Sequence, residues 1–167
     1  VRARQTMIAG DYANAIRLLE TLQRQRADDP EVDLWLARAY FSGGQQERLL
    51  GWLPELLARR PQDSELRVML ARAQLQSGNT RAAVATLEEH PPALATDPTY
   101  HALLAASYQQ TSQWQQSANL YRRLVALRPN QATWQLGLGI ALEQLDQDVE
   151  AADQLGLHAR ILLHRLG

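Results

Sequence analysis

The strongest constraint on this chain is a sequence pattern that recurs every 34 residues without a gap. One part of the pattern is a Leu followed by a small residue, and it is found as Leu36-Ala37, Leu70-Ala71, Leu104-Ala105 and Leu138-Gly139. A second part follows in register, as the pairs Leu49 and Leu53, Ala83 and Leu87, Ser117 and Tyr121, and Ala151 and Leu155. Two antiparallel helices pack closely where a small side chain faces a large one. The period therefore predicts stacked helical hairpins.

The helix ends are marked by residues with known conformational preferences. Gly10, Gly44 and Gly78 stand at the expected turn inside each hairpin. Asp29-Pro30 and Asp97-Pro98 each combine an N-cap with a Pro in the first turn. Pro91-Pro92 cuts a helix short, so residues 90–97 are expected to form an irregular connector. We count about nine helices, the first over residues 11–24 and the last over residues 148–164.

The period and its small residues resemble the tetratricopeptide-repeat (TPR) family. The resemblance implies an all-α fold, a right-handed α-solenoid of TPR helix-turn-helix repeats that forms a single domain. The chain would start inside the first helix of a truncated repeat, residues 1–29. Four full repeats would follow over residues 30–63, 64–97, 98–131 and 132–167.

In TPR proteins the first helix of each repeat lines a concave groove, which usually holds a peptide or a partner protein. The register projects the following residues into that groove: Leu34, Arg38, Phe41, Val68, Arg72, Leu75, Ala102, Ala106, Gln109, Leu136, Ile140 and Glu143. Arg38 and Arg72 occupy the same repeat position, so two guanidinium groups could clamp a carboxylate. Alternatively, both are solvated or paired with Glu31 and Glu65.

Composition excludes several other classes of function. The 17 basic and 18 acidic residues nearly cancel, so nothing favours nucleic acid or anionic lipid. No apolar run approaches the ~20 residues of a membrane span, and we expect no direct membrane contact. There is no Cys, no two His share a helix face, and no catalytic motif is present. We therefore expect no enzyme, no cofactor and no metal.

The apparent motif Gly137-Leu138-Gly139 is read instead as a repeat feature, with Gly139 at a close-packing position. The four tryptophans fall near helix starts and between repeats, where a role in the core or at a seam is expected. They are Trp35, Trp52, Trp114 and Trp134. The chain starts at Val1 without an initiator Met, and we interpret it as part of a longer protein.

The last two repeats have a more particular resemblance, carried by residues 97–105, Tyr121-Arg122-Arg123-Leu124, Pro129-Asn130 and the stretch from Trp134 to Glu143. These segments resemble the C-terminal TPR region of MSHA-type (type IV) pilus biogenesis proteins of Gram-negative bacteria. The resemblance implies a periplasmic adaptor in pilus or secretion machinery, at the inner membrane, with its anchor outside this fragment. The alternatives are a cytoplasmic TPR adaptor and a docking module of a larger enzyme or exporter.

The final predicted helix suggests self-association. One stripe of it, Leu155, Ala159, Leu162 and Leu166, is expected to pack on the preceding helices. Leu157, Ile161 and Leu163 then find no further repeat to cover them. Because exposed apolar patches often mark interaction sites, we expect a weak homodimer through this end.

Overall fold

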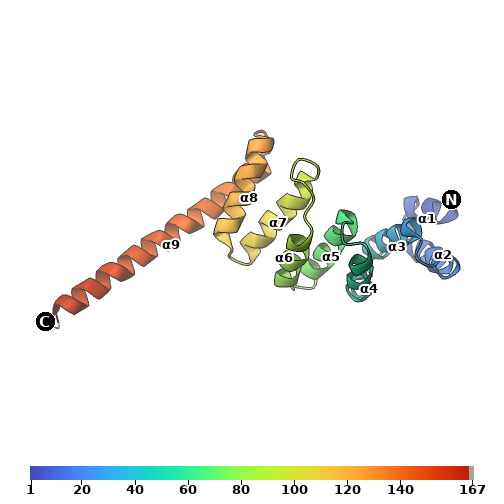
Figure 1. Cartoon of the computed structure of the whole chain (residues 1–167), viewed down its shortest axis with the longest axis horizontal. Coiled ribbons are helices and arrows are strands. Elements are labelled where there is room, and N and C mark those ends of the chain that lie inside the picture. Colours follow the sequence, from blue (N-terminus) through green and yellow to red (C-terminus); the bar gives the residue numbers. More distant parts are fainter. Residues whose placement is uncertain (166–167) are drawn as a thin grey trace. The chain divides into compact units, whose positions relative to one another are not determined.

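The computed structural model describes the backbone of residues 1–165 and the side chains of residues 1–149. Within this part the chain forms nine helices joined by turns and loops, which confirms the predicted all-α fold (Figure 1). They are α1 (Arg2–Ile8), α2 (Tyr12–Gln25), α3 (Pro30–Ser42), α4 (Gln46–Arg59), α5 (Ser64–Gln76), α6 (Thr80–Glu89), α7 (Pro98–Gln110), α8 (Trp114–Leu127) and α9 (Ala132–Arg165). The first helix, α1, is short, with 7 residues.

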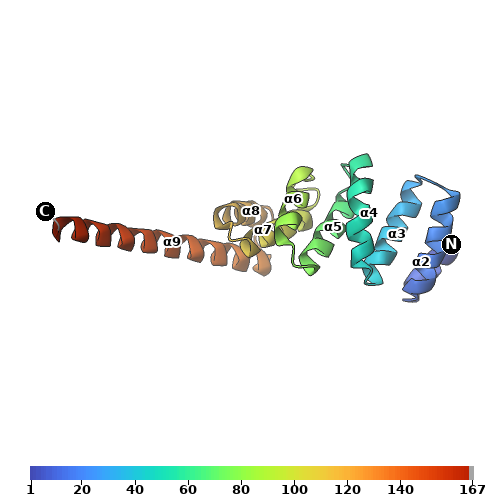
Figure 2. The same cartoon turned by 90° about the horizontal axis from the view of Figure 1, so that it is seen from below.

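The chain divides into two compact units. Unit 1 is Val1–Pro92 and contains α1 to α6; unit 2 is Ala93–Gly167 and contains α7 to α9. Within unit 1 each helix packs against the next along the chain, and the helices alternate in direction (Figure 2). The boundary between the units falls within the predicted connector, where α6 ends at Glu89 just before Pro91 and Pro92. Proline has no backbone N–H to donate, so it cannot continue the helix.

Side-chain caps and left-handed turn residues set the helix boundaries. Asp29 accepts from the backbone N–H groups of Glu31 and Val32, and Asp97 accepts from that of Tyr100. Both caps agree with the sequence analysis. Each turn inside a hairpin has one residue with positive φ. These residues are spaced by 34: Gly10 (75°), Gly44 (70°), Gly78 (80°) and Ser112 (57°).

The core confirms the predicted register of small and large residues. Ala37, Ala71 and Ala105, one from each of the hairpins α3–α4, α5–α6 and α7–α8, are all 0 % exposed. The large residues of the second helices are buried as well, namely Leu53, Leu87 and Tyr121. Burying a large side chain of this kind stabilises the fold by roughly 1.5–3 kcal/mol relative to leaving it exposed.

The last repeat differs from the prediction. The turn expected before residue 148 is not formed, and α9 continues as a single helix from Ala132 to Arg165 (Figure 1). The repeat position that is left-handed in the four earlier turns is Asp146 here, and it lies within the helix. Its neighbours Glu143, Gln144 and Leu145 are good helix formers, so no local signal interrupts the helix. The predicted patch residues Leu155, Leu157, Ala159, Ile161, Leu162, Leu163 and Leu166 lie outside the residues whose side chains are described.

The close-packing role predicted for Gly139 is wrong. A Cβ placed on Gly139 would have no neighbour within 4 Å. The close-packed glycine is Gly137, where an added Cβ would lie 2.4 Å from Cζ of the Tyr121 ring. The reason is that Gly139 faces the place of a second helix that does not fold back, whereas Gly137 faces α8.

Candidate functional site

Three first helices of unit 1 carry an Arg at the same repeat position. Arg4 lies on α1, Arg38 on α3 and Arg72 on α5, each 34 residues from the next. We call these three residues the arginine ladder. Arg38 and Arg72 are the predicted pair, whereas Arg4 was not predicted, although one more step of the period leads to it.

Trp35 connects the first two members of the arginine ladder. The guanidinium carbons of Arg4 and Arg38 each lie 4.9 Å from the centroid of the Trp35 ring. Such cation–π contacts contribute about 0.5–1 kcal/mol at exposed sites. A cavity of about 490 Å³ opens beside Trp35, lined by residues that include Arg4, Leu22 and Val32. Trp35 therefore lies at a packing seam, as expected, and also forms part of the exposed charged face.

Arg38 is already neutralised by a carboxylate of the same chain. Its Nε donates to Oε1 of Glu65 at 2.6 Å and one terminal nitrogen donates to Oε2 at 2.9 Å. This fork-shaped contact raises the pKa of Arg38. Arg72 is exposed and makes no hydrogen bond or ion pair within the described part of the chain. The alternative of pairing with Glu65 thus holds for Arg38, while Arg72 is solvated.

The apolar residues projected into the groove from unit 1 are all half-buried. They are Leu34, Phe41, Val68 and Leu75. Leu34 and Phe41 pack against the core, so part of each side chain is used to hold the hairpins together. The remaining surface gives the arginine ladder an apolar border.

The projected residues of unit 2 form a different surface. Ala102 and Ala106 are half-buried, and Nε2 of Gln109 donates to the backbone oxygen of Gly137 at 2.6 Å. Gln109 is thus engaged in packing α7 against α9. On α9, Leu136 and Ile140 are 65 % and 40 % exposed, and Glu143 is exposed too. At the ladder position unit 2 has Ala106 and Ile140, so the basic feature is confined to unit 1.

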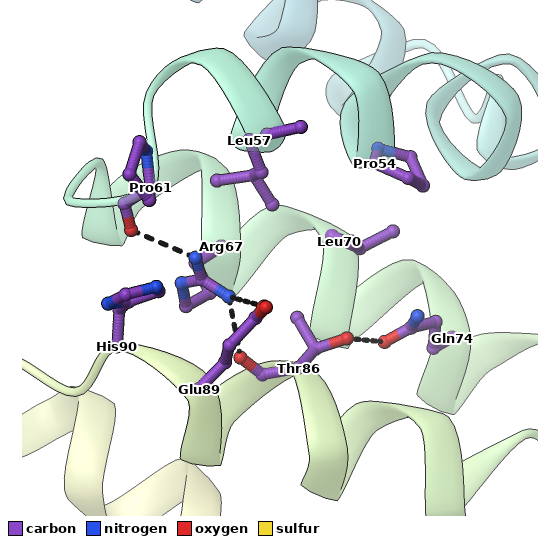
Figure 3. A pocket seen from close by; sticks show the side chains of 10 residues that line it. Pro54, Leu57, Pro61, Arg67, Leu70, Gln74, Thr86, Glu89 and His90 are labelled. Carbon is purple, nitrogen blue, oxygen red and sulfur yellow. Dashed lines mark hydrogen bonds and ion pairs between the residues drawn. The ribbon is translucent and has the colours of Figure 1, made fainter.

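A second site of unit 1 surrounds a buried arginine that the sequence analysis missed (Figure 3). Arg67 on α5 is 1 % exposed and lines a cavity of about 460 Å³ with Leu57, Leu70 and His90. Its guanidinium donates to the backbone oxygens of Pro61 at 2.9 Å and Thr86 at 3.0 Å.

The charge of Arg67 is balanced by Glu89 at the end of α6. The two groups are 2.8 Å apart, and this hydrogen bond lowers the pKa of the Glu89 carboxyl. The Nε of Arg67 has no hydrogen-bond partner among the residues that the structure describes. Because the remaining nitrogens bind two backbone carbonyls, Arg67 ties the α4–α5 loop to α6, and we assign it a structural role.

The repeat position of Arg67 is polar throughout the chain, which is the signal that could have revealed it. Asp33, Arg67 and His101 are all buried at this position, three residues before the core Leu of each repeat. Asp33 accepts a hydrogen bond from Gln23 at 3.0 Å, and its second oxygen lies 2.8 Å from a guanidinium nitrogen of Arg60. We call Asp33, Arg67, His101 and Gln135 the junction position.

The part of the chain that the structure describes lacks two further kinds of site. No group of three or more His, Cys, Asp or Glu is placed there to hold a metal ion. Nor does any helix of that part combine the length and the apolar character of a membrane span.

A series of antiparallel helix pairs with a fixed 34-residue step defines an α-helical repeat protein. Tetratricopeptide-repeat family models match residues 7–48, 53–106 and 103–161. The chain belongs to the tetratricopeptide-repeat family.

Solved structures of MamA proteins have the same fold. MamA from Desulfovibrio magneticus RS-1, residues 41 to the end, is 20 % identical, with a TM-score of 0.73 over 92 % of this chain and 87 % of that one. A second MamA crystal structure is 19 % identical, with a TM-score of 0.74 over 90 % of this chain and 88 % of that one. A search of the curated proteins found no match. These structures are of MamA proteins and give no support to the resemblance to MSHA-type pilus proteins, which stays a prediction.

Proposed function

We propose that this chain is a non-catalytic scaffold that binds an acidic peptide segment of a partner protein on the first-helix face of unit 1. The observation that supports the proposal is the arginine ladder: one Arg per repeat, in register, beside half-buried apolar residues. An extended peptide laid across α1, α3 and α5 can place carboxylates at the spacing of neighbouring helices. Apolar side chains of the same peptide can contact Trp35 and Leu75.

Glu65 has a specific part in this proposal, because it occupies Arg38 in the free protein. A carboxylate of the peptide competes with Glu65 for the same guanidinium. Arg72 and Arg4 have no such internal carboxylate partner among the described residues, so they provide the first contacts. Exposed charge pairs contribute only about 0.2–1 kcal/mol each, so affinity depends on several of them acting together.

The test uses the whole chain and two synthetic fluorescent peptides, one alternating Glu with Leu and one alternating Gln with Leu. Fluorescence anisotropy at low salt measures both affinities. The double variant Arg38→Ala and Arg72→Ala should weaken binding of the Glu peptide roughly tenfold. Its melting temperature should fall by no more than a degree or two, since Arg72 is exposed and the partly exposed Arg38–Glu65 pair contributes little to stability. Glu65→Gln should strengthen the same binding by releasing Arg38.

The matched control is Arg122→Ala with Arg123→Ala, which removes two exposed charges from α8 of unit 2. Equal affinity for the two peptides would contradict the proposal. So would an equal loss in the α8 control, because binding would then follow net charge alone. A large loss of stability with intact binding would show that Arg38 and Arg72 are structural.

The more particular role, an adaptor in pilus or secretion machinery at the periplasmic face of the inner membrane, is part of the proposal. It rests on the resemblance of residues 97–143 to MSHA-type pilus biogenesis proteins. The test is the accessibility of the tagged full-length protein to protease added to spheroplasts. Protection of the tag would favour the cytoplasmic adaptor instead.

A further inference from the structure

The first half of α9 leaves open a surface whose core Leu and neighbouring small residue are buried in the three hairpins α3–α4, α5–α6 and α7–α8. Three residues define it, Leu138, Gly139 and Leu142, and we call them the open seam. Gly139 is exposed, and Leu138 and Leu142 are half-buried. Their equivalents one period earlier, Leu104, Ala105 and Tyr108, are exposed by 6 %, 0 % and 9 %.

The earlier repeats also show what covers this surface. In the α7–α8 hairpin the second helix returns over the first, and Oγ of Ser117 donates to the backbone oxygen of Ala105 at 3.0 Å. The equivalent residues in the last repeat are Ala151 and Gly139, both small enough for the same close approach. The covering segment is thus present in the sequence, but the straight path of α9 carries it away from its own seam.

We propose that two copies of this chain exchange these segments, so that residues 148–165 of each copy cover the open seam of the other. Two α9 helices would then lie antiparallel, related by a twofold axis near residue 146. Such an arrangement is closed and self-complementary, because each copy gives one covering segment and receives one. It provides both repeats with a second helix and requires no turn.

The turn position explains why exchange is favoured over folding back. In each closed hairpin this position has positive φ, and in three of the four it is Gly. Asp is able to adopt this conformation, as Asp28 does with φ of 62°. Residue 146 would however leave a continuous helix to do so, and a non-Gly residue adopts the left-handed conformation only at an energetic cost. A second copy supplies the same packing without that cost.

Charge opposes the exchange and gives it a recognisable dependence on salt. Glu143, Asp146 and Asp148 are exposed around the proposed axis, and no Lys or Arg occurs between Arg128 and Arg160. Two copies would bring these carboxylates within about 10 Å of each other, which is the screening length at moderate ionic strength. The dimer should therefore become tighter as salt is added.

The first experiment is sedimentation velocity on the whole chain, with Asp146→Gly compared with Asp146→Ala. Both variants remove the same charge, but only Gly readily adopts the left-handed turn, and it also weakens the continuous helix relative to Ala. The Gly variant should dimerise at least about tenfold more weakly than the Ala variant. A wild type that remains monomeric at high micromolar concentration, or equal dimerisation of the two variants, would overturn the proposal.

The second experiment uses a disulfide, which is unambiguous because the chain has no Cys. The variant Gly139→Cys with Ala151→Cys is oxidised and analysed on a non-reducing gel. An exchanged pair gives a covalent dimer, whereas a helix that folds back gives an internal disulfide and a monomer band. The internal disulfide, or no disulfide at all, would overturn the proposal, and each single-Cys variant serves as the control.

Discussion

Unit 1 and the end of unit 2 have the same period, yet equivalent repeat positions are buried in unit 1 and exposed at the end of unit 2. In unit 1 the small residue of the first helix is enclosed, as with Ala37 and Ala71 at 0 % exposure. In α9 the equivalent Gly139 faces open space. The junction position changes too, from the buried Arg67 to the exposed Gln135. The difference shows that burial here depends on whether the second helix returns, and less on the residue itself.

The largest effect is expected at the junction position. Arg67→Ala removes two hydrogen bonds to backbone carbonyls and leaves a cavity, so it should lower the free energy of unfolding by roughly 2–4 kcal/mol. Gln135→Ala is the matched change at an exposed site, where Nε2 donates only to the oxygen of Pro129. It should cost no more than about 1 kcal/mol. Urea denaturation measures both, and equal losses would remove the contrast between the two units.

A smaller effect is expected at the small-residue position. Ala105→Leu should overpack the closed α7–α8 hairpin and cost roughly 1–3 kcal/mol. Gly139→Leu should instead stabilise α9 by about 0.5–1 kcal/mol, because Leu is a better helix former than Gly and meets no neighbour. The measurement is the denaturation midpoint at a protein concentration low enough for monomers. An unchanged midpoint for Ala105→Leu would show that the register is wrong there.

The smallest effect is the loss of stability at acidic pH, which we expect from a carboxyl group of unit 1. The pKa of Glu89 is lowered by its hydrogen bond from Arg67, below an ordinary value of 4.5. A carboxyl group with a lowered pKa in the folded state stabilises the protein above that ordinary value and loses this contribution as the pH falls through the lowered pKa. Stability should therefore decline below pH 4.5. Glu89→Gln should reduce this decline, as followed by urea midpoints at decreasing pH; an identical profile would exclude the pair as a source of acid sensitivity.

Much of the fold was predictable because it depends on local signals. The caps Asp29 and Asp97, the break at Pro91 and the enclosed Ala105 all follow from residue type and spacing. The continuous α9 did not follow, because Asp146 is compatible both with a helix and with a left-handed turn. The period alone favoured the turn, and the helix-forming residues around Asp146 decided against it.

The site was predictable in part, for a related reason. The projected first-helix residues lie on first helices as expected, but their partners come from other repeats. Glu65 neutralises Arg38, and Gln109 binds the backbone of α9. Such contacts depend on which rotamers meet across a seam, and spacing does not encode them. Burial of Arg67 was not predicted, because charged side chains are usually exposed to solvent, although the positions around it face the core.

The junction position also bears on how an array of this kind can be recombined during evolution. Asp33 and its neighbour Arg60 lie within the same predicted repeat, and Arg67 and Glu89 lie within the next one. A crossover between repeats transfers each buried charge together with its counter-charge. A crossover between α5 and α6 separates Arg67 from Glu89, and the descendant inherits a buried cation without its counter-charge. Whole helical hairpins are therefore the segments whose exchange keeps each of these two buried charges beside its counter-charge.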